Sequence, residues 1–191
     1  GINYTIDQSE DEIWHVTYYP SMADCESIIK SRAPKYRNSW RGLIPLHANR
    51  QDVERVLGPP KRTWETSAAY ETDHEMVNVK YAKGKCGEPN NEWNVPADVV
   101  VEFVVGQRFG FLLSQLNLDP NRYERQEVFP LPEIDNPPKI ANYVSQADGI
   151  SIRAQSSGGG EEVVVSITYR PARTDEKLRC NKKAKGATTK L

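Results

Sequence analysis

The chain has 191 residues, with 25 Lys and Arg against 26 Asp and Glu, and its net charge is −1 at pH 7. That balance gives no electrostatic reason to expect nucleic acid or an anionic membrane as a partner. The longest apolar runs are far shorter than the roughly twenty residues that span a bilayer.

The length fits one moderate domain or two very small ones. One domain is favoured, because a unit of about sixty residues buries too little surface to stand alone comfortably. The chain begins with Gly1 where a gene product begins with Met, as a mature form without its signal peptide would. We therefore expect an exported protein, located in the periplasm or outside the cell.

Residues 1–40 are expected to form an N-terminal strand and a short helix. The aromatic and β-branched run Glu-Ile-Trp-His-Val-Thr-Tyr-Tyr at 12–19 stops at Pro20 and predicts a strand. Ser21, with Asp24 three residues later, is a capping signal for a helix over 22–32. Pro34 prevents a longer helix.

Residues 41–107 are expected to form a unit of one helix and two strands. Asn49 is a good N-cap, and Asp52 lies near the positive end of the helix dipole. The stripe Val53, Val56 and Leu57 predicts an amphipathic helix that ends at Gly58 and Pro59-Pro60. The stretch 70–79 predicts one strand, with Val77 and Val79 alternating on one face, and 99–105 predicts the next, broken by the segment Gly106–Gly110.

Residues 108–170 are expected to repeat this unit. The leucines of 112–118 predict a short helix, four prolines within 129–139 predict an extended connector, and the hairpin 143–154 to 163–169 follows across a flexible turn at 155–160. In both units an aromatic is followed seven and nine residues later by a β-branched pair: Tyr70, Val77 and Val79, then Tyr143, Ile150 and Ile152. Residues 171–191 are polar and basic and predict a tail or linker.

The predicted strands pair as sequential hairpins, so the expected fold class is α+β. It consists of an antiparallel sheet with short helices on one face, in tandem helix–strand–strand repeats, and 41–170 form one core domain.

The stretch from Leu43 to Pro60, followed by a Tyr-led strand pair, resembles the repeat of the SmpA/OmlA (BamE-like) lipoproteins. The same unit occurs in tandem in β-lactamase-inhibitor-protein-like domains. The phrases Trp-Arg-Gly-Leu-Ile-Pro-Leu, Trp-Asn-Val-Pro and Asp-Glu-Lys-Leu-Arg-Cys also resemble a group of exported bacterial proteins with no assigned activity. These resemblances imply a non-enzymatic envelope protein that binds another envelope protein through its sheet face.

No catalytic, cofactor or metal signature stands out. The histidines His15, His47 and His74 are not within metal-ligand spacing of one another. His74 is expected in a strand, where its neighbours Asp73 and Glu75 point to the opposite face. No nucleophile elbow occurs, and the glycines at 158–160 lack the ending of a phosphate loop.

Three cysteines, Cys25, Cys86 and Cys180, allow one bridge and a free thiol, or no bridge. In an exported protein we expect Cys86–Cys180, because each follows a predicted strand of its own unit and matching positions would lie close together.

The candidate binding residues are aromatic. Trp40, Trp64 and Trp93 lie in or beside predicted loops, and Trp64 is expected to be exposed because its neighbours are polar. At least two of the three tryptophans are expected to cap the core instead. Tyr70 and Tyr143 complete the candidate surface.

The sequence favours a non-catalytic binding or envelope-assembly module that acts through protein contacts. One alternative is a carbohydrate-binding module that uses the loop tryptophans. Another is an enzyme with an unrecognised site, which would need a cleft holding His47 or His74 beside a Cys or Ser.

Overall fold

The computed structural model describes residues 2–7, 12–18, 38–87, 91–128, 139–156 and 160–180. Contacts within the chain divide it into two compact units, Gly1–Ala33 and Pro34–Leu191. In the first unit, strand β1 (Ile2–Asp7) pairs antiparallel with β2 (Glu12–Tyr18). The strand predicted at 12–19 is confirmed, and the helix predicted at 22–32 lies outside the described residues.

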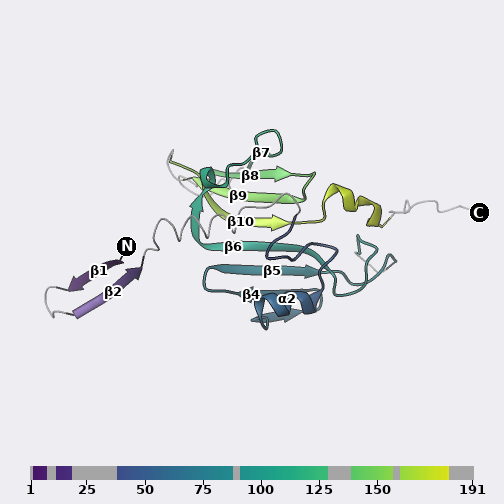
Figure 1. The fold of residues 1–191 in the computed structure, drawn as a ribbon, viewed down its shortest axis with the longest axis horizontal. Coiled ribbons are helices and arrows are strands. Elements are labelled where there is room, and N and C mark those ends of the chain that lie inside the picture. The colour runs from purple at the N-terminus through teal and green to yellow at the C-terminus, as the bar shows by residue number, and fades with distance from the viewer. Residues whose placement is uncertain are drawn as a thin grey trace, which may run out of the picture. The chain divides into compact units, whose positions relative to one another are not determined.

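The second unit is built on an antiparallel sheet of eight strands in the order β3-β4-β5-β6-β10-β9-β8-β7 (Figure 1). The strands are β3 (Arg62–Trp64), β4 (Ser67–Glu71), β5 (Glu75–Tyr81), β6 (Val100–Leu112), β7 (Glu124–Val128), β8 (Lys139–Ser145), β9 (Ile150–Ser156) and β10 (Val163–Tyr169). The helices that the structure describes are few and short, so the α+β class with an antiparallel sheet is confirmed.

The helix α2 (Arg50–Leu57) forms as predicted. The Asn49 side chain accepts a hydrogen bond from the Asp52 N–H, and the Asp52 carboxylate accepts one from the Asn49 N–H, both at 3.0 Å. Gly58 ends the helix with φ 78°, a backbone conformation that suits glycine. An eight-residue helix is marginal alone, and the burial of Val53 against the rest of the unit supplies the missing stability.

The stretches 70–79 and 143–154, each predicted as one strand, are hairpins of two strands in the structure. Each unit therefore has more strands than the two predicted. Tyr70 lies on β4 and pairs with Val77 of β5, while Tyr143 lies on β8 and pairs with Ile152 of β9. His74 therefore lies in the β4–β5 turn rather than in a strand. The turn is closed by Thr72, whose N–H donates to the Glu75 carbonyl oxygen at 2.9 Å and whose hydroxyl accepts from the Glu75 N–H at 3.0 Å.

Strand β6 does not break at Gly106–Gly110, as the sequence suggested, but runs on to Leu112. Its pairing with β10 jumps from Gly106 opposite Ser166 to Phe111 opposite Val164, so residues 107–110 bulge against residue 165 alone. A Cβ on Gly110 would lie 2.2 Å from the Val163 side chain, which explains the glycine. The helix predicted at 112–118 is reduced to the 3-10 helix η1 (Leu113–Leu116).

The core lies against one face of the sheet. The ring of Phe103 stacks on Tyr169 at 4.8 Å and touches Trp40 at 5.9 Å. Val77 and Ile152 are buried on the same face, on either side of the central strands β6 and β10. Each such side chain contributes about 1.5–3 kcal/mol through burial.

The segment expected to be a tail from residue 171 is folded up to Cys180. It contains the 3-10 helix η2 (Arg173–Leu178), and Arg179 forms a β-bridge with Trp93. Cys86 and Cys180, the pair named from the sequence, are joined by a disulfide with the Cα atoms 5.5 Å apart. Residues 181–191 and most of the proline-rich connector lie outside the described residues.

Candidate functional site

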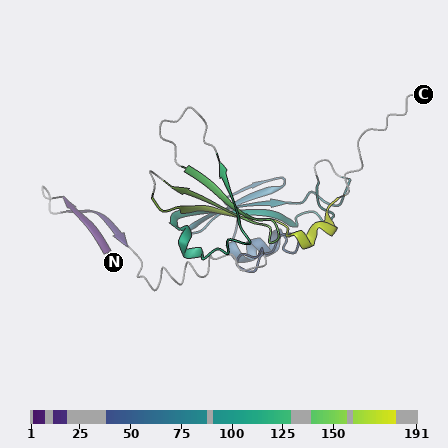
Figure 2. The ribbon, with the colours of Figure 1, turned by 90° about the horizontal axis from the view of Figure 1, so that it is seen from above.

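Among the residues that the structure describes, one face of the eight-stranded sheet carries no helix. The α2, η1 and η2 helices all lie on the other side (Figure 2). Strand β5 shows the consequence, because Val77 and Val79 are buried while Met76, Asn78 and Lys80 are exposed. We call the uncovered side the open face.

The register defines the open face as four rows of directly paired residues. The first row crosses all eight strands: Arg62, Ala69, Asn78, Val104, Thr168, Ser151, Val144 and Glu124. The second row comprises Glu71, Met76, Gly106, Ser166, Arg153, Asn142 and Gln126. The third row comprises Trp64, Ser67, Lys80 and Glu102. The fourth row, at the other end of the strands, comprises Leu112, Val163, Gln155, Ile140 and Val128. The side chains of the first three rows are mostly polar, and all of them are at least partly exposed.

Side-chain size varies across the open face. In the first two rows the residues on the central strands β6 and β10 are small, namely Val104, Gly106, Ser166 and Thr168. We call these four the central strip. The longer side chains of Met76 on β5 and Arg153 on β9 flank it, so the strip rises less above the backbone of the sheet than these two neighbours do.

Two large apolar side chains are exposed on the open face. Trp64 is 52% exposed and Met76 is 57% exposed. A third, Phe109, projects from the bulge of β6, and its ring lies 6.5 Å from that of His74. Exposed Trp and Met side chains of this kind are typical contact residues in protein interfaces.

The other aromatic candidates do not join Trp64. Trp40 is 4% exposed, Trp93 7% and Tyr70 2%, so none of the three can act as a surface contact. Trp93 is buried in an apolar cluster with Leu46, Ala82, Val95 and Val101, and the Arg179 guanidinium lies over its ring at 5.0 Å. The expectation that at least two tryptophans cap the core therefore agrees with their burial.

Tyr70 and Tyr143 owe their positions to hydrogen bonds. The hydroxyl groups of Tyr70 and Tyr81 lie 2.9 Å apart in the core, and burial is the largest cause of the raised pKa of both. Tyr143 is half-buried and donates its hydroxyl to Glu162, while Arg125 Nε donates to the same hydroxyl at 3.1 Å. Burial raises the pKa of Tyr143, and the Glu162 carboxylate raises it further.

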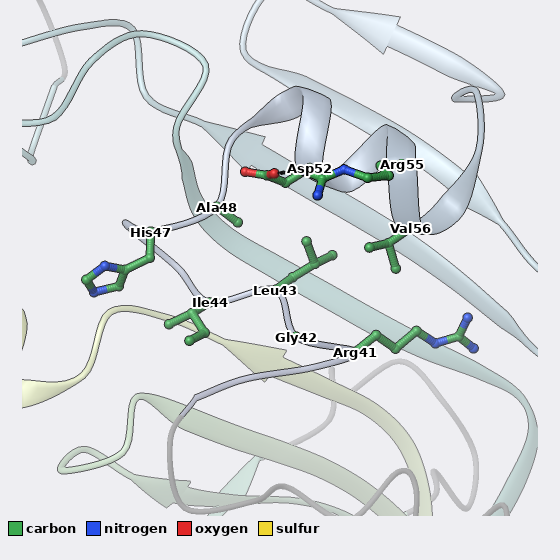
Figure 3. Close-up of a pocket in the computed structure, with 9 residues that line it drawn as sticks. All are labelled: Arg41, Gly42, Leu43, Ile44, His47, Ala48, Asp52, Arg55 and Val56. Carbon is green, nitrogen blue, oxygen red and sulfur yellow. Dashed lines mark hydrogen bonds and ion pairs between the residues drawn. The ribbon is translucent and has the colours of Figure 1, made fainter.

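A pocket of about 370 Å³ lies on the helix-bearing side, between the loop 41–48 and α2 (Figure 3). Its charged groups are paired. Arg41 donates to Glu75 at 2.7 Å, and Arg55 pairs with Asp52. The His47 ring points away from Leu43 and Val56, and its Nε2 lies 3.8 Å from a carboxylate oxygen of Asp175.

The enzyme alternative requires His47 or His74 to lie beside a Ser or Cys side chain. Across the described residues, no hydrogen bond joins His47 or His74 to a Ser or Cys. Within the same ranges, no group of three His, Cys, Asp or Glu side chains could hold a metal ion. In the part of the chain that the structure describes, no helix is long and apolar enough to cross a membrane.

Comparison with known proteins assigns no family. No protein-family model matches the chain, and no curated protein matches it. Neither comparison supports membership of the SmpA/OmlA or β-lactamase-inhibitor-protein-like groups. Among solved structures, a DUF4309 family protein (YjgB) from Bacillus subtilis strain 168 is 13% identical over 76% of this chain and 97% of that chain, with a TM-score of 0.36. At that TM-score the likeness carries no conclusion about family or function.

The open face was anticipated from the sequence, but its composition was not. The neighbours that make up each row come from strands far apart in the chain, such as Asn78 beside Val104 and Val104 beside Thr168. Only the strand order and the register bring them together.

Proposed function

We propose that the protein is a non-catalytic, exported binding module that acts through protein–protein contacts on its open face. One observation carries the proposal: within the described residues, the eight-stranded sheet has a face without helix cover, which presents exposed Trp64 and Met76 among polar side chains. A protein interface is built in this way, with a few large apolar anchors in a polar surround.

The dimensions of the open face support a protein partner. Eight strands spaced about 4.8 Å apart give a width of about 34 Å, and the first three rows of paired residues cover about 20 Å along the strands. The resulting area of roughly 700 Å² is close to the ~800 Å² that each partner contributes to a standard interface. A small molecule would use only a fraction of it.

The carbohydrate alternative has less support. Sugar-binding surfaces rely on exposed aromatic side chains, and two of the three candidate tryptophans, Trp40 and Trp93, are buried. Trp64 alone offers a short platform. The position of the remaining aromatic groups therefore favours a protein partner over a glycan.

An envelope location forms part of the proposal. The Cys86–Cys180 disulfide supports it, because disulfides persist in the periplasm and outside the cell and are rare in the reducing cytosol. The sequence resemblance to exported envelope proteins points in the same direction. An envelope-assembly role would follow from a partner in that compartment.

We also propose that the sheet arose by tandem duplication. The strand order supports it, since β3-β4-β5-β6 is followed by β10-β9-β8-β7, two meanders that meet at β6 and β10. A helix precedes each set in the chain, α2 before β3 and η1 before β7.

Affinity capture from an envelope extract tests the proposed function. Thr168→Arg places a long charged side chain in the central strip, and we expect it to abolish recovery of any partner that the wild-type chain captures. Val56→Arg is the matched control, because Val56 is exposed on the helix-bearing side. Equal recovery by wild type and Thr168→Arg, with both variants folded, would remove the open face from consideration.

A further inference from the structure

Three basic side chains of the open face have no partner within the chain that the structure describes. Arg62, Lys80 and Arg153 are exposed, and none forms an ion pair or a hydrogen bond with another described residue. Each belongs to a row of the open face, on β3, β5 and β9 respectively. Their charge is therefore available to a partner.

The acidic side chains of the open face are mostly neutralised. Glu71 forms an ion pair with Arg108, and Glu102 forms one with Arg170. Glu124 is on the edge strand β7, far from the centre. The open face thus carries an unmatched positive charge, although the whole chain has a net charge of −1.

Two of these cations lie on opposite sides of the central strip and at opposite ends of it. Arg153 is in the second row, beside Ser166, whereas Lys80 is in the third row, beside Glu102 and one row beyond the strip. Lys80 lies on β5 and Arg153 on β9, with β6 and β10 between them. Three strand spacings separate β5 from β9, or about 14 Å. An α-helix with its side chains is about 10–12 Å across, so a single segment of a partner fits over the strip with a cation on each side.

We propose that the partner of the open face presents an acidic segment, which lies over the central strip and pairs its carboxylates with Lys80 and Arg153. The proposal rests on the proposed function and names the chemistry of the partner. Small side chains in the strip let the segment approach the sheet, and the long stems of Lys80 and Arg153 reach its carboxylates from both sides. Trp64 and Met76 supply apolar contacts beside it.

Exposed charges of this kind act chiefly on recognition. A solvated ion pair contributes about 0.2–1 kcal/mol, and charges at a rim raise the association rate and exclude partners of the wrong sign. The open face should therefore discriminate strongly between acidic and basic segments, and its binding should weaken as salt screens the charges.

Fluorescence anisotropy with a labelled oligoglutamate peptide tests the proposal on the full chain. We expect the peptide to bind the wild type at low salt, and Lys80→Glu/Arg153→Glu to weaken binding at least about tenfold, because two attractions become repulsions. The matched control is Lys85→Glu/Lys177→Glu, which makes the same charge change at exposed sites off the open face. The control should bind within about twofold of wild type.

Three results would overturn the acidic-segment proposal. They are no measurable binding of oligoglutamate, equal weakening by the control variant, and tighter binding of an oligothymidylate, which would indicate a nucleic-acid surface instead. Capture from envelope extract with both variants distinguishes a failure of this proposal from a failure of the proposed function. If Thr168→Arg abolishes capture and Lys80→Glu/Arg153→Glu leaves it unchanged, the open face binds a partner without an acidic segment.

Discussion

The hydrogen bond between Tyr70 and Tyr81 provides a test of the packing beneath the open face. Both side chains are 2% exposed, and their hydroxyl oxygens lie 2.9 Å apart. Tyr70→Phe or Tyr81→Phe alone leaves the other hydroxyl buried without its partner, which costs about 1–3 kcal/mol. The double variant removes both polar groups together, so it should lose much less than the sum of the single losses.

Urea denaturation followed by tryptophan fluorescence measures these free energies of unfolding. We expect an interaction energy of about 1–2 kcal/mol in the double-mutant cycle. Tyr143→Phe serves as the control, because Tyr143 is half-buried and water can replace its hydroxyl as a partner of Glu162. Additive losses, to within about 0.5 kcal/mol, would refute the buried hydrogen bond.

Four further predictions concern stability. Burial, with a smaller contribution from Glu75, raises the pKa of Tyr169 above 10, so its stabilising effect should be complete below pH 10 and be lost as pH rises further. Tyr169→Phe should reduce that loss in alkaline denaturation experiments. Asn49→Ala removes the side-chain cap of α2 and should cost about 1 kcal/mol in urea. Reduction of Cys86–Cys180 should cost about 2–5 kcal/mol, seen as a lower Tm with reductant. Gly149→Ala should reduce the free energy of unfolding by at least about 1 kcal/mol, seen as a lower Tm. Its φ is +65°, and the new Cβ would lie 2.3 Å from the Arg170 carbonyl oxygen.

The parts of the fold that were predicted correctly depend on local signals. Helix α2 has its cap, its apolar stripe and its stop within a dozen residues, from Asn49 to Pro60. These signals act on the backbone directly, so no distant contact is needed to interpret them. The antiparallel sheet was likewise predicted from local signals, namely short segments of alternating apolar and polar residues joined by turns.

One of the two missed turns has a physical explanation, whereas the β8–β9 turn contains Asp148-Gly149, an ordinary turn signal in the sequence. The β4–β5 turn contains Thr72, Asp73 and His74 but no glycine, and its Thr72–Glu75 hydrogen bonds replace the usual turn residues. Apolar alternation on either side therefore looks like one continuous strand. The edge strands β3 and β7 were missed because their residues are nearly all exposed and show no alternation.

The candidate site was harder to predict because it depends on distant contacts. Trp93 is buried in a cluster with Leu46 and Val101, against which Leu178 also packs, and these residues are far apart in the sequence. The unpaired charges on the open face become visible only once the register places Lys80 and Arg153 on either side of β6 and β10. The exposure of Trp64 was predicted from its polar neighbours alone.

Hydroxyl-radical footprinting of the captured complex tests the role of the open face most directly. The side chains of Trp64 and Met76 react readily with radicals and are exposed on the open face, whereas His47 is exposed on the helix-bearing side. The open-face account predicts that the partner slows oxidation of Trp64 and Met76 and leaves that of His47 unchanged. Protection of His47, with Trp64 and Met76 oxidised as fast as in the free protein, would contradict it.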